Sequence, residues 1–509
     1  MFLPILGVIT TMNYSGDVPA AGGDYVDVEF AVPAGTVEIK VAHADESDYD
    51  IRDWGVWAPE GFRGWGGGNT EDAIIGVSES SRSYLIGPIT PGTWRVSIGK
   101  AKLDTDGGHY EITVTCYDAP TLVPRARAAY SPAPLAEGRR WYKGDFHVHS
   151  SESGDADASL DQIGELAKSR GLDFVNLSDH NTSSHLPLAA ARQPSHPDVL
   201  FLRGAEITTY AGHGNAVGLP SYIDHRIGFQ NRTIEGILGD VEAQGALFIV
   251  NHPALELGDN CIGCAWKHPT TPWDKVAGLE IITGKWDLVE RLFTPIAIAK
   301  WDELEAQGFR LAAIGGSDDH RAGTGTGDTD TPIGSPTTLV LADSLSEAAL
   351  VEGIRAGRTI VQLRGPDDPF VEVTMTRADG TAAEIGDDID GIASVTMPIH
   401  ITGGAGNLVQ LWRDGVKLSQ APITSDDFRT TLTDTPGAGD FRYRVELIND
   451  SNNRIVVTSH FYVSAVADSG GCCDAGGPAG ALPGLLLALT GLLPRWRRRR
   501  ARTPSRPRA

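Results

Sequence analysis

The feature that most constrains the fold is a series of short apolar segments in the middle of the chain, each followed by histidine or acidic residues. Apolar runs of this length are typical of buried strands, and helical patterns lie between several of them. One pattern begins after Ser159, an expected N-cap, has apolar residues at every third position from Leu160 to Leu166, and ends at Gly171. This alternation predicts an α/β fold with parallel strands and barrel-like closure over 141–365. A further helix is expected after SLSE, Ser344–Glu347, which has the pattern of a capping box.

The residues after these strands have the chemistry of metal ligands. The segment YKGDFHVHS ends in His147 and His149, which the period of two places on one face of a strand. The carboxyl ends of parallel barrel strands share one face, so the polar residues of the other strands should gather there. The candidates are His147, His149, Asp179, His180, Glu206, His213, His252, Asp318, Asp319 and His320. Imidazole and carboxylate are the usual ligands of zinc and similar ions. The number of candidates predicts two or three ions, bridged by a carboxylate such as Glu206.

Each motif alone has an ordinary explanation, because HxH, NHP and SDH all occur by chance and Asp155 and Asp157 could be solvated loop acids. Separate polar clusters beside a core would each cost about 1–3 kcal/mol if left unpaired. One shared site therefore explains the pattern better than independent coincidences.

Sandwich-like β patterns flank this region. Short alternating strands separated by Gly and Pro cover 25–117, and similar runs follow 365. The expected organisation is a β-sandwich at 1–118, a linker at 119–140, the α/β domain at 141–365, a second β-sandwich at 366–465 and a tail at 466–509. The opening MFLPILGVITTMNYSGD is interpreted as a strand or as part of a chain whose true start lies upstream, and it has no recognisable signal peptide.

Two smaller groups of residues leave alternatives open. Trp54, Trp57 and Trp65 lie in an expected loop, where they could stack on a sugar, although burial under the loop is more usual for tryptophan. Cys261 and Cys264 form CIGC, interpreted as a loop thiol pair or a local disulfide because no second CxxC completes a zinc knuckle.

The net charge of −23 disfavours a phosphate-backbone binder unless metal ions screen the site, because the body is even more acidic than this figure once the arginines of 495–509 are set aside. We expect no stable nucleic-acid partner, although a nuclease acting on short oligonucleotides stays open.

The motifs DFHVHS, SDHNT, NHP and GSDDH, in this order, resemble those of the PHP domain superfamily. HSSESGDA and GAEITTYAGHGNAVG resemble its CehA/McbA-type metallohydrolase branch. The resemblance implies a distorted (β/α)7 PHP barrel, flanked here by two all-β sandwiches, and two or three zinc, manganese or iron ions. The ligands that it implies are His147, His149, Asp155, His180, Glu206, His213, His252, Asp318 and His320. The acid of the first motif is placed at Asp155 and not Asp157, although SGDAD departs from the family's shorter SDG. Asp179 and Asp319 would orient the histidines.

The expected activity is therefore that of a metal-dependent hydrolase with a metal-bridging hydroxide, acting as a phosphoesterase on a small or oligomeric phosphate mono- or diester. One alternative is an ester or amide (carbamate-type) hydrolase that uses the same site. An alternative of another class is a non-catalytic cell-surface protein that binds polysaccharide and has a structural metal site. GGSDDH is not GxSxG, so a serine-hydrolase elbow is not expected.

The tail suggests a location. Cys472 and Cys473, an uncharged stretch from Pro478 to Pro494, and an arginine cluster resemble a MYXO-CTERM-type sorting tail. The stretch is at the short end of what spans a bilayer, and the arginines would favour the cytoplasmic side. The resemblance implies an exported protein held at the cell surface or envelope, in contact with the membrane only through this tail, and a sorting protease as a partner.

Overall fold

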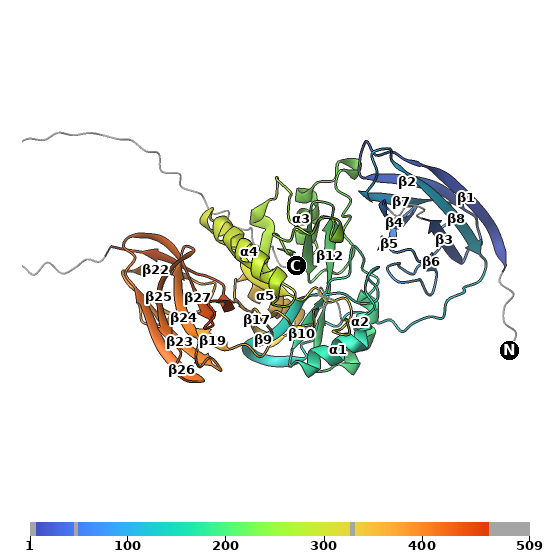
Figure 1. Cartoon of the computed structure of the whole chain (residues 1–509). Coiled ribbons are helices and arrows are strands. Elements are labelled where there is room, and N and C mark those ends of the chain that lie inside the picture. Colours follow the sequence, from blue (N-terminus) through green and yellow to red (C-terminus); the bar gives the residue numbers. More distant parts are fainter. Residues whose placement is uncertain (1–6, 45–48, 326–330, 468–509) are drawn as a thin grey trace, which may run out of the picture. The chain divides into compact units, whose positions relative to one another are not determined.

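Two four-stranded sheets form the N-terminal region of the computed structural model, which describes residues 7–44, 49–325 and 331–467. One sheet has the order β2-β7-β4-β5 and the other β1-β8-β3-β6 (Figure 1). The strands are β1 (Val8–Val18), β2 (Tyr25–Val32), β3 (Glu38–Ala44), β4 (Ile51–Ala58), β5 (Gly61–Gly67), β6 (Ala73–Gly76), β7 (Gly92–Lys102) and β8 (Gly108–Tyr117). Side chains from both sheets, among them Ile39, Trp94 and Val114, share one core. This is the arrangement of a β-sandwich.

The tryptophan-rich segment is not a loop, contrary to the sequence-based prediction. It forms the antiparallel pair β4–β5, and register shifts at Trp54/Gly55 and Val56/Trp57 break the alternation that would have indicated strands. Trp54, Trp57 and Trp65 are all buried, as the more usual interpretation predicted.

The middle region alternates strands and helices as expected, and parallel pairing joins β9, β10 and β11. Its elements are β9 (Ala136–Val148), α1 (Leu160–Ser169), β10 (Phe174–Leu177), α2 (Leu186–Arg192), β11 (Leu200–Leu202), β12 (Gly204–Thr209), β13 (Gly212–Val217), α3 (Ile234–Ala243), β14 (Leu247–Val250), β15 (Val276–Thr283), α4 (Leu288–Ala306) and β16 (Ala312–Gly316). Short 3₁₀ turns lie at Gln193–Ser195, Phe229–Asn231, Gly258–Asn260 and Trp273–Lys275. Helix α1 starts where predicted, because Ser159 and Gln162 form a capping box.

A second sheet of the middle region, β12-β13-β14-β15-β16, is only partly parallel. β13 runs antiparallel to β12, because Tyr210 and Ala211 make a turn too short for a crossover, and it also runs antiparallel to β14. The two sheets meet at their carboxyl ends through isolated parallel bridges between Val148 and Asp319 and between His180 and Glu206. The structure is thus mixed α/β with many strands and few helices, and the closed (β/α)7 barrel stays a prediction.

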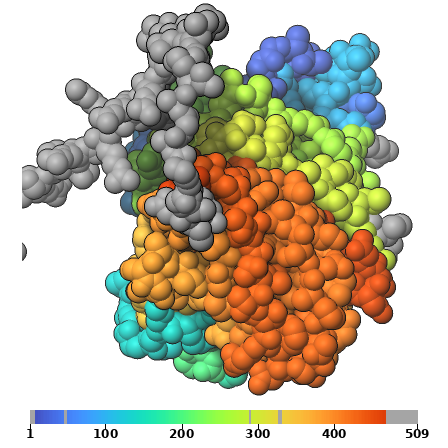
Figure 2. Space-filling view, turned by 90° about the vertical axis from the view of Figure 1, so that its left-hand side faces the viewer, coloured from blue at the N-terminus to red at the C-terminus, as the bar shows by residue number. Residues whose placement is uncertain are grey.

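Most of the remaining strands continue the sheet of β9. β17 (Thr337–Leu345) pairs with β9 and with β18 (Thr359–Gln362), and β18 pairs with β28 (Arg454–Thr458). The other elements are α5 (Glu347–Arg355), β19 (Phe370–Val373), β20 (Met375–Thr376), β21 (Ala382–Ala383), β22 (Asp388–Ile392), β23 (Val395–Thr402), β24 (Leu408–Arg413), β25 (Val416–Pro422), β26 (Asp427–Asp434), β27 (Gly439–Ile448) and β29 (Phe461–Ala465). The sheet of β9 continues through β17, β18, β28, β27, β24 and β25, with β29 attached at β27 and β22 at β29, while β19-β23-β26 and β20-β21 form two separate sheets. The strands after Phe370, orange in Figure 2, gather on one face.

The N-cap of α5 lies two residues later than the predicted capping box places it. Ser346, not Ser344, accepts a hydrogen bond from the backbone N–H of Ala349. The strand β17 extends to Leu345, which keeps Ser344 in extended structure, where its hydroxyl lies 3.0 Å from that of Ser346.

Two remaining sequence features can be placed. Cys261 and Cys264 form a local disulfide within the loop after β14. Among the described residues, we find no helix with the length and apolarity needed to cross a bilayer. The residues of the predicted sorting tail from 468 onward lie outside the described part, so the tail remains a prediction from sequence.

Candidate metal centre

The predicted ligands come together at the carboxyl ends of the two sheets. His147 is the penultimate residue of β9 and His180 follows β10, while the side chains of Glu206 on β12 and His213 on β13 are in contact. His252 follows β14. Asp318 and His320 follow β16, and Asp155 lies in the loop after β9. The residues that the sequence pattern selected thus form one cluster.

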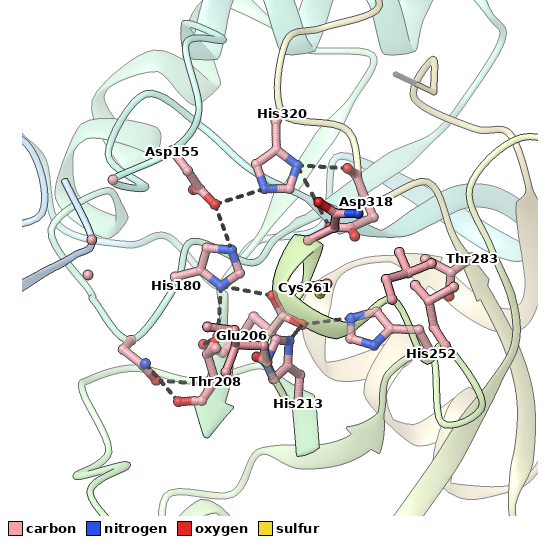
Figure 3. Close-up of a pocket in the computed structure, with 18 of the residues that line it drawn as sticks. Asp155, His180, Glu206, Thr208, His213, His252, Cys261, Thr283, Asp318 and His320 are labelled. Carbon is pink, nitrogen blue, oxygen red and sulfur yellow. Dashed lines mark hydrogen bonds and ion pairs between the residues drawn. The ribbon is translucent and has the colours of Figure 1, made fainter. Parts of the chain in front are cut away.

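Glu206 is the centre of this cluster. Its Oε2 atom lies 2.9 Å from His180 Nδ1 and 3.3 Å from His147 Nε2. Its Oε1 atom lies 3.3 Å from His252 Nε2 and 3.4 Å from His213 Nδ1. Figure 3 shows this carboxylate between the imidazoles of His180, His213 and His252. One buried carboxylate therefore touches histidines from four separate strand ends, as a bridging ligand would.

Asp318 and Asp155 hold the other histidines. Asp318 Oδ1 is 3.2 Å from His147 Nε2 and 3.1 Å from His149 Nε2. Asp155 Oδ2 is 3.2 Å from His180 Nε2 and 3.4 Å from His320 Nε2. Asp318 has a positive φ of 57°, a left-handed conformation that is strained for a non-glycine residue and that recurs at functional sites.

Within the described residues, potential ligand atoms within 4.8 Å of one another form three groups. The first is His147, His149, Glu206 and Asp318, the second is His149, His180 and His320, and the third is His213, His252 and Cys264. The sulfur of Cys264 is bonded to Cys261, so the third group has only its two histidines to offer.

The charges in this cluster depend strongly on one another. Burial lowers the pKa of His147, but Asp318, Glu206 and Glu280 outweigh it and raise that pKa well above its usual value. Burial raises the pKa of Glu206, but His147 and His180 pull it well below the usual range. Without a cation, protonated imidazoles thus balance the carboxylates.

Burial and neighbouring charges also shift the pKa values of His320 and His149, but in opposite directions. Burial lowers the pKa of His320, but Asp155 raises it to about 9. Burial and the neighbouring His320 and His180 lower the pKa of His149 to about 4. His149 is therefore neutral near pH 7, as a metal ligand must be.

Asp179 and Asp319, which are predicted to orient the histidines, contact the loops around the site. Asp179 accepts hydrogen bonds from the backbone N–H and the hydroxyl of Ser150 and pairs with His185. Asp319 accepts backbone hydrogen bonds from Arg321 and Gly323. These contacts hold the loops that carry the candidate ligands, and a role of the two carboxylates in orienting ligand histidines stays a prediction.

Sequence reasoning missed the groups that contact the imidazoles from behind. Glu280 Oε1 lies 3.0 Å from His147 Nδ1, and Glu280 Oε2 accepts the backbone N–H of His252. Asn251 donates its amide to Glu206 Oε1 at 2.9 Å. The signal for Glu280 was present, since a glutamate inside the apolar strand GLEIIT would be costly to bury without a partner.

The comparisons with known proteins find solved structures that are similar to this chain at low sequence identity. No family model matches the chain, and no curated protein matches it. Among solved structures, a two-domain protein from Bacteroides vulgatus containing a predicted PHP-like metal-dependent phosphoesterase is similar at 19% identity over 67% of this chain and 100% of its own, with a TM-score of 0.37.

Two further structures are more distant. A proposed metal-dependent phosphoesterase from Bifidobacterium adolescentis has 14% identity over 42% of this chain and 95% of its own, with a TM-score of 0.26. A β-glucuronidase from Bacteroides uniformis has 9% identity over 87% of this chain and 74% of its own, with a TM-score of 0.18. At these values the similarities assign no family, so the PHP resemblance continues to rest on the motifs.

Proposed function

We propose that this protein is a metal-dependent hydrolase, and specifically a phosphoesterase acting on phosphate mono- or diesters. The observation that carries the proposal is the convergence of histidines from separate strand ends on the buried carboxylate of Glu206. The open cavity beside this carboxylate, which is lined by His180 and His320 among others, gives a substrate access to the cluster.

The residues fit divalent cations. Among the described residues, the buried atoms His147 Nε2 and Glu206 Oε2 have no hydrogen-bond partner, although they lie 3.3 Å apart. Buried polar atoms without partners cost about 1–3 kcal/mol each, and a cation would pair them. Histidine with carboxylate suits zinc, manganese or iron. The proposed ligands are His147, His149, Glu206 and Asp318 for one ion, and Asp155, His180 and His320 around a second.

Bound ions would lower the pKa of a coordinated water toward about 7 and neutralise charge that develops on the ester. The chain's own part is positional. Glu206 holds imidazoles from both groups at fixed separations, and Glu280 fixes the ring of His147 from behind. Asp155, whose side chain is 56% exposed, faces the cavity from the side that a substrate would approach.

The test is made on the full-length protein loaded with zinc or manganese. Metal content is measured, and hydrolysis is followed with p-nitrophenyl phosphate, bis(p-nitrophenyl) phosphate and p-nitrophenyl acetate. We expect turnover of one of the two phosphates that disappears on chelation. Turnover of the acetate alone would favour the ester or carbamate alternative. No turnover of any substrate at full metal content would contradict the hydrolase proposal.

We also propose that the protein works outside the cytoplasm. The local disulfide between Cys261 and Cys264 supports this, since disulfides persist mainly in oxidising compartments. Fractionation of the native host, with detection of the protein in the envelope or medium, tests the proposal. Recovery only from the cytoplasm would contradict it.

A further inference from the structure

The cavity beside the metal centre is built from two regions of the chain. It has a volume of about 780 Å³, within the usual range of ligand sites. His180 and Asp318 of the metal centre line one side. Tyr25, Asp53 and Trp65 of the N-terminal sandwich line another. The sandwich thus contributes a wall to the cavity in which the proposed chemistry takes place.

The sandwich is also attached to the loop that carries Asp155. The hydroxyl of Ser83 donates to the carbonyl oxygen of Glu152 at 2.7 Å. A Cβ atom at Gly154 would overlap the carbonyl oxygen of Gly66, so the two backbones pack as closely as glycine allows. The cavity wall supplied by the sandwich is therefore fixed relative to the metal-centre loop.

Two polar groups at this wall are suited to hydroxyl groups. Asp53 accepts a hydrogen bond from the hydroxyl of Tyr210 at one carboxylate oxygen, and burial raises its pKa to about 6. His225 is only 1% exposed and lines the cavity, and within the described residues its Nε2 has no hydrogen-bond partner. A hydroxyl both donates and accepts, so it can pair with a carboxylate and with either tautomer of an imidazole.

Aromatic rings surround these groups. The rings of Trp65 and His225 meet edge to face with centroids 4.5 Å apart. Tyr25 stacks on Tyr210 at 5.8 Å and meets Trp65 edge to face at 6.1 Å. Such rings offer an apolar surface to the C–H groups of a ligand, with polar groups at defined points beside it.

From this wall we infer a recognition subsite, made of Tyr25, Asp53, Trp65, Tyr210 and His225, for the organic group of the ester. The subsite takes an uncharged, hydroxylated ring of the sugar or cyclitol class. Hydroxyls of the ring pair with Asp53 and His225, and its C–H groups lie against the aromatic rings. The carboxylate of Asp53 repels a ring that bears its own negative charge. The inference rests on the proposed hydrolase function and names the class of its substrate.

The experiment compares glucose 1-phosphate with glucuronic acid 1-phosphate, two esters that differ by a carboxylate on the ring. kcat/KM is measured at pH 8 on the metal-loaded full-length protein. We expect glucose 1-phosphate to be preferred by about tenfold or more, because like charges in a closed site repel. Asp53→Asn should bring the two values to within about threefold, since the amide keeps the shape and loses the charge.

The matched control is Asp17→Asn, which removes an exposed carboxylate on β1 that pairs with His109. This variant should retain the wild-type preference. Equal kcat/KM values for the two esters in the wild-type protein would overturn the inference, and this measurement requires no variant. An Asp53→Asn variant that keeps the full preference would overturn it too.

A third ester, phenyl phosphate, separates failure of the subsite from failure of the function. Turnover of phenyl phosphate with no preference between the sugar esters leaves the hydrolase proposal standing and overturns the subsite. If none of the three esters is hydrolysed, the subsite is tested by isothermal titration calorimetry, which measures the heat of binding of methyl glucoside to the metal-free protein. Heat of binding that Asp53→Asn abolishes supports the subsite, and no heat with the wild-type protein overturns it.

Discussion

Two buried groups of carboxylates in this molecule are balanced by different cations. Glu79 and Glu152, where the sandwich meets the metal region, pair with Arg125 and Arg127 of the linker. The acids of the metal centre, Glu206 foremost, pair with histidines. Guanidinium keeps its charge at all ordinary pH values, whereas imidazole can lose its proton. The first group is thus a permanent ion pair, and the second can exchange protons for a metal cation.

The largest loss of activity is expected from substitution of Glu206, a buried carboxylate that pairs with histidines and not with arginine. Glu206→Gln should lower the rate of hydrolysis by more than about 100-fold, because it removes the carboxylate that contacts four histidines. Loss of a residue that only orients a metal ligand lowers activity by about 10- to 100-fold. Metal content by elemental analysis should fall with the activity of the Glu206 variant. The control is Glu347→Gln, a buried glutamate paired with Arg203, which should keep its metal. Full metal content in the Glu206 variant would contradict the assignment of the histidine-paired carboxylates as metal ligands.

A smaller loss should separate the two acids of the first motif. Asp155→Asn breaks the contacts to His180 and His320 and should lower kcat by about tenfold or more. Asp157→Asn should stay within about twofold of the wild type, because surface substitutions away from such contacts have small effects. Steady-state kinetics on both variants checks this. The reverse ranking would transfer the ligand role to Asp157.

Removal of metal by a chelator should lower the free energy of unfolding through the carboxylates that pair with histidines. Metal that binds only the folded state adds about 2.7–4.1 kcal/mol to the free energy of unfolding at 100 to 1,000 times the dissociation constant. EDTA should therefore lower the melting temperature of the loaded wild-type protein more than that of the Glu206 variant, which lacks a ligand of the first ion. Equal shifts in both proteins would place the metal elsewhere.

The smallest effect concerns the arginine-paired group. Burial raises the pKa of Glu79, but Arg127 and Arg125 outweigh it and lower the pKa to about 2. Its contribution to stability is therefore present above the ordinary value of 4.5 and is lost as pH falls toward 2.

Glu79→Gln should lower the free energy of unfolding by about 1–3 kcal/mol near pH 7 and flatten its pH dependence between these limits. Urea titrations at several pH values measure both effects. Metal content should not change, and a loss of metal in this variant would link the two groups.

The sequence pattern was informative wherever a residue and its strand end were adjacent in the chain. His147, His149 and the acids after β16 could be placed because strand ends in an α/β fold share a face. The pattern was uninformative where partners came from inside a strand, as for Glu280, or where bulges disturbed the period, as in β4 and β5.

The wall formed by Asp53 and Trp65 could not be predicted for a different reason. These residues lie far from the ligand motifs in the chain, and nothing local indicates which surface of a sandwich will meet another region. The antiparallel β13 escaped prediction because GHGN has the composition of a loop, while its backbone pairs on both sides.

The pairing of β18 with β28 has a practical consequence for anyone who shortens the chain. A fragment that stops after 365 would keep β18 but lose the strand that satisfies its outer row of amide and carbonyl groups, including those of Ile360 and Gln362. Open strand borders recruit other chains and promote aggregation. A fragment that resists aggregation should therefore extend to Ala465, because the C-terminal strands then cover the open border of β18.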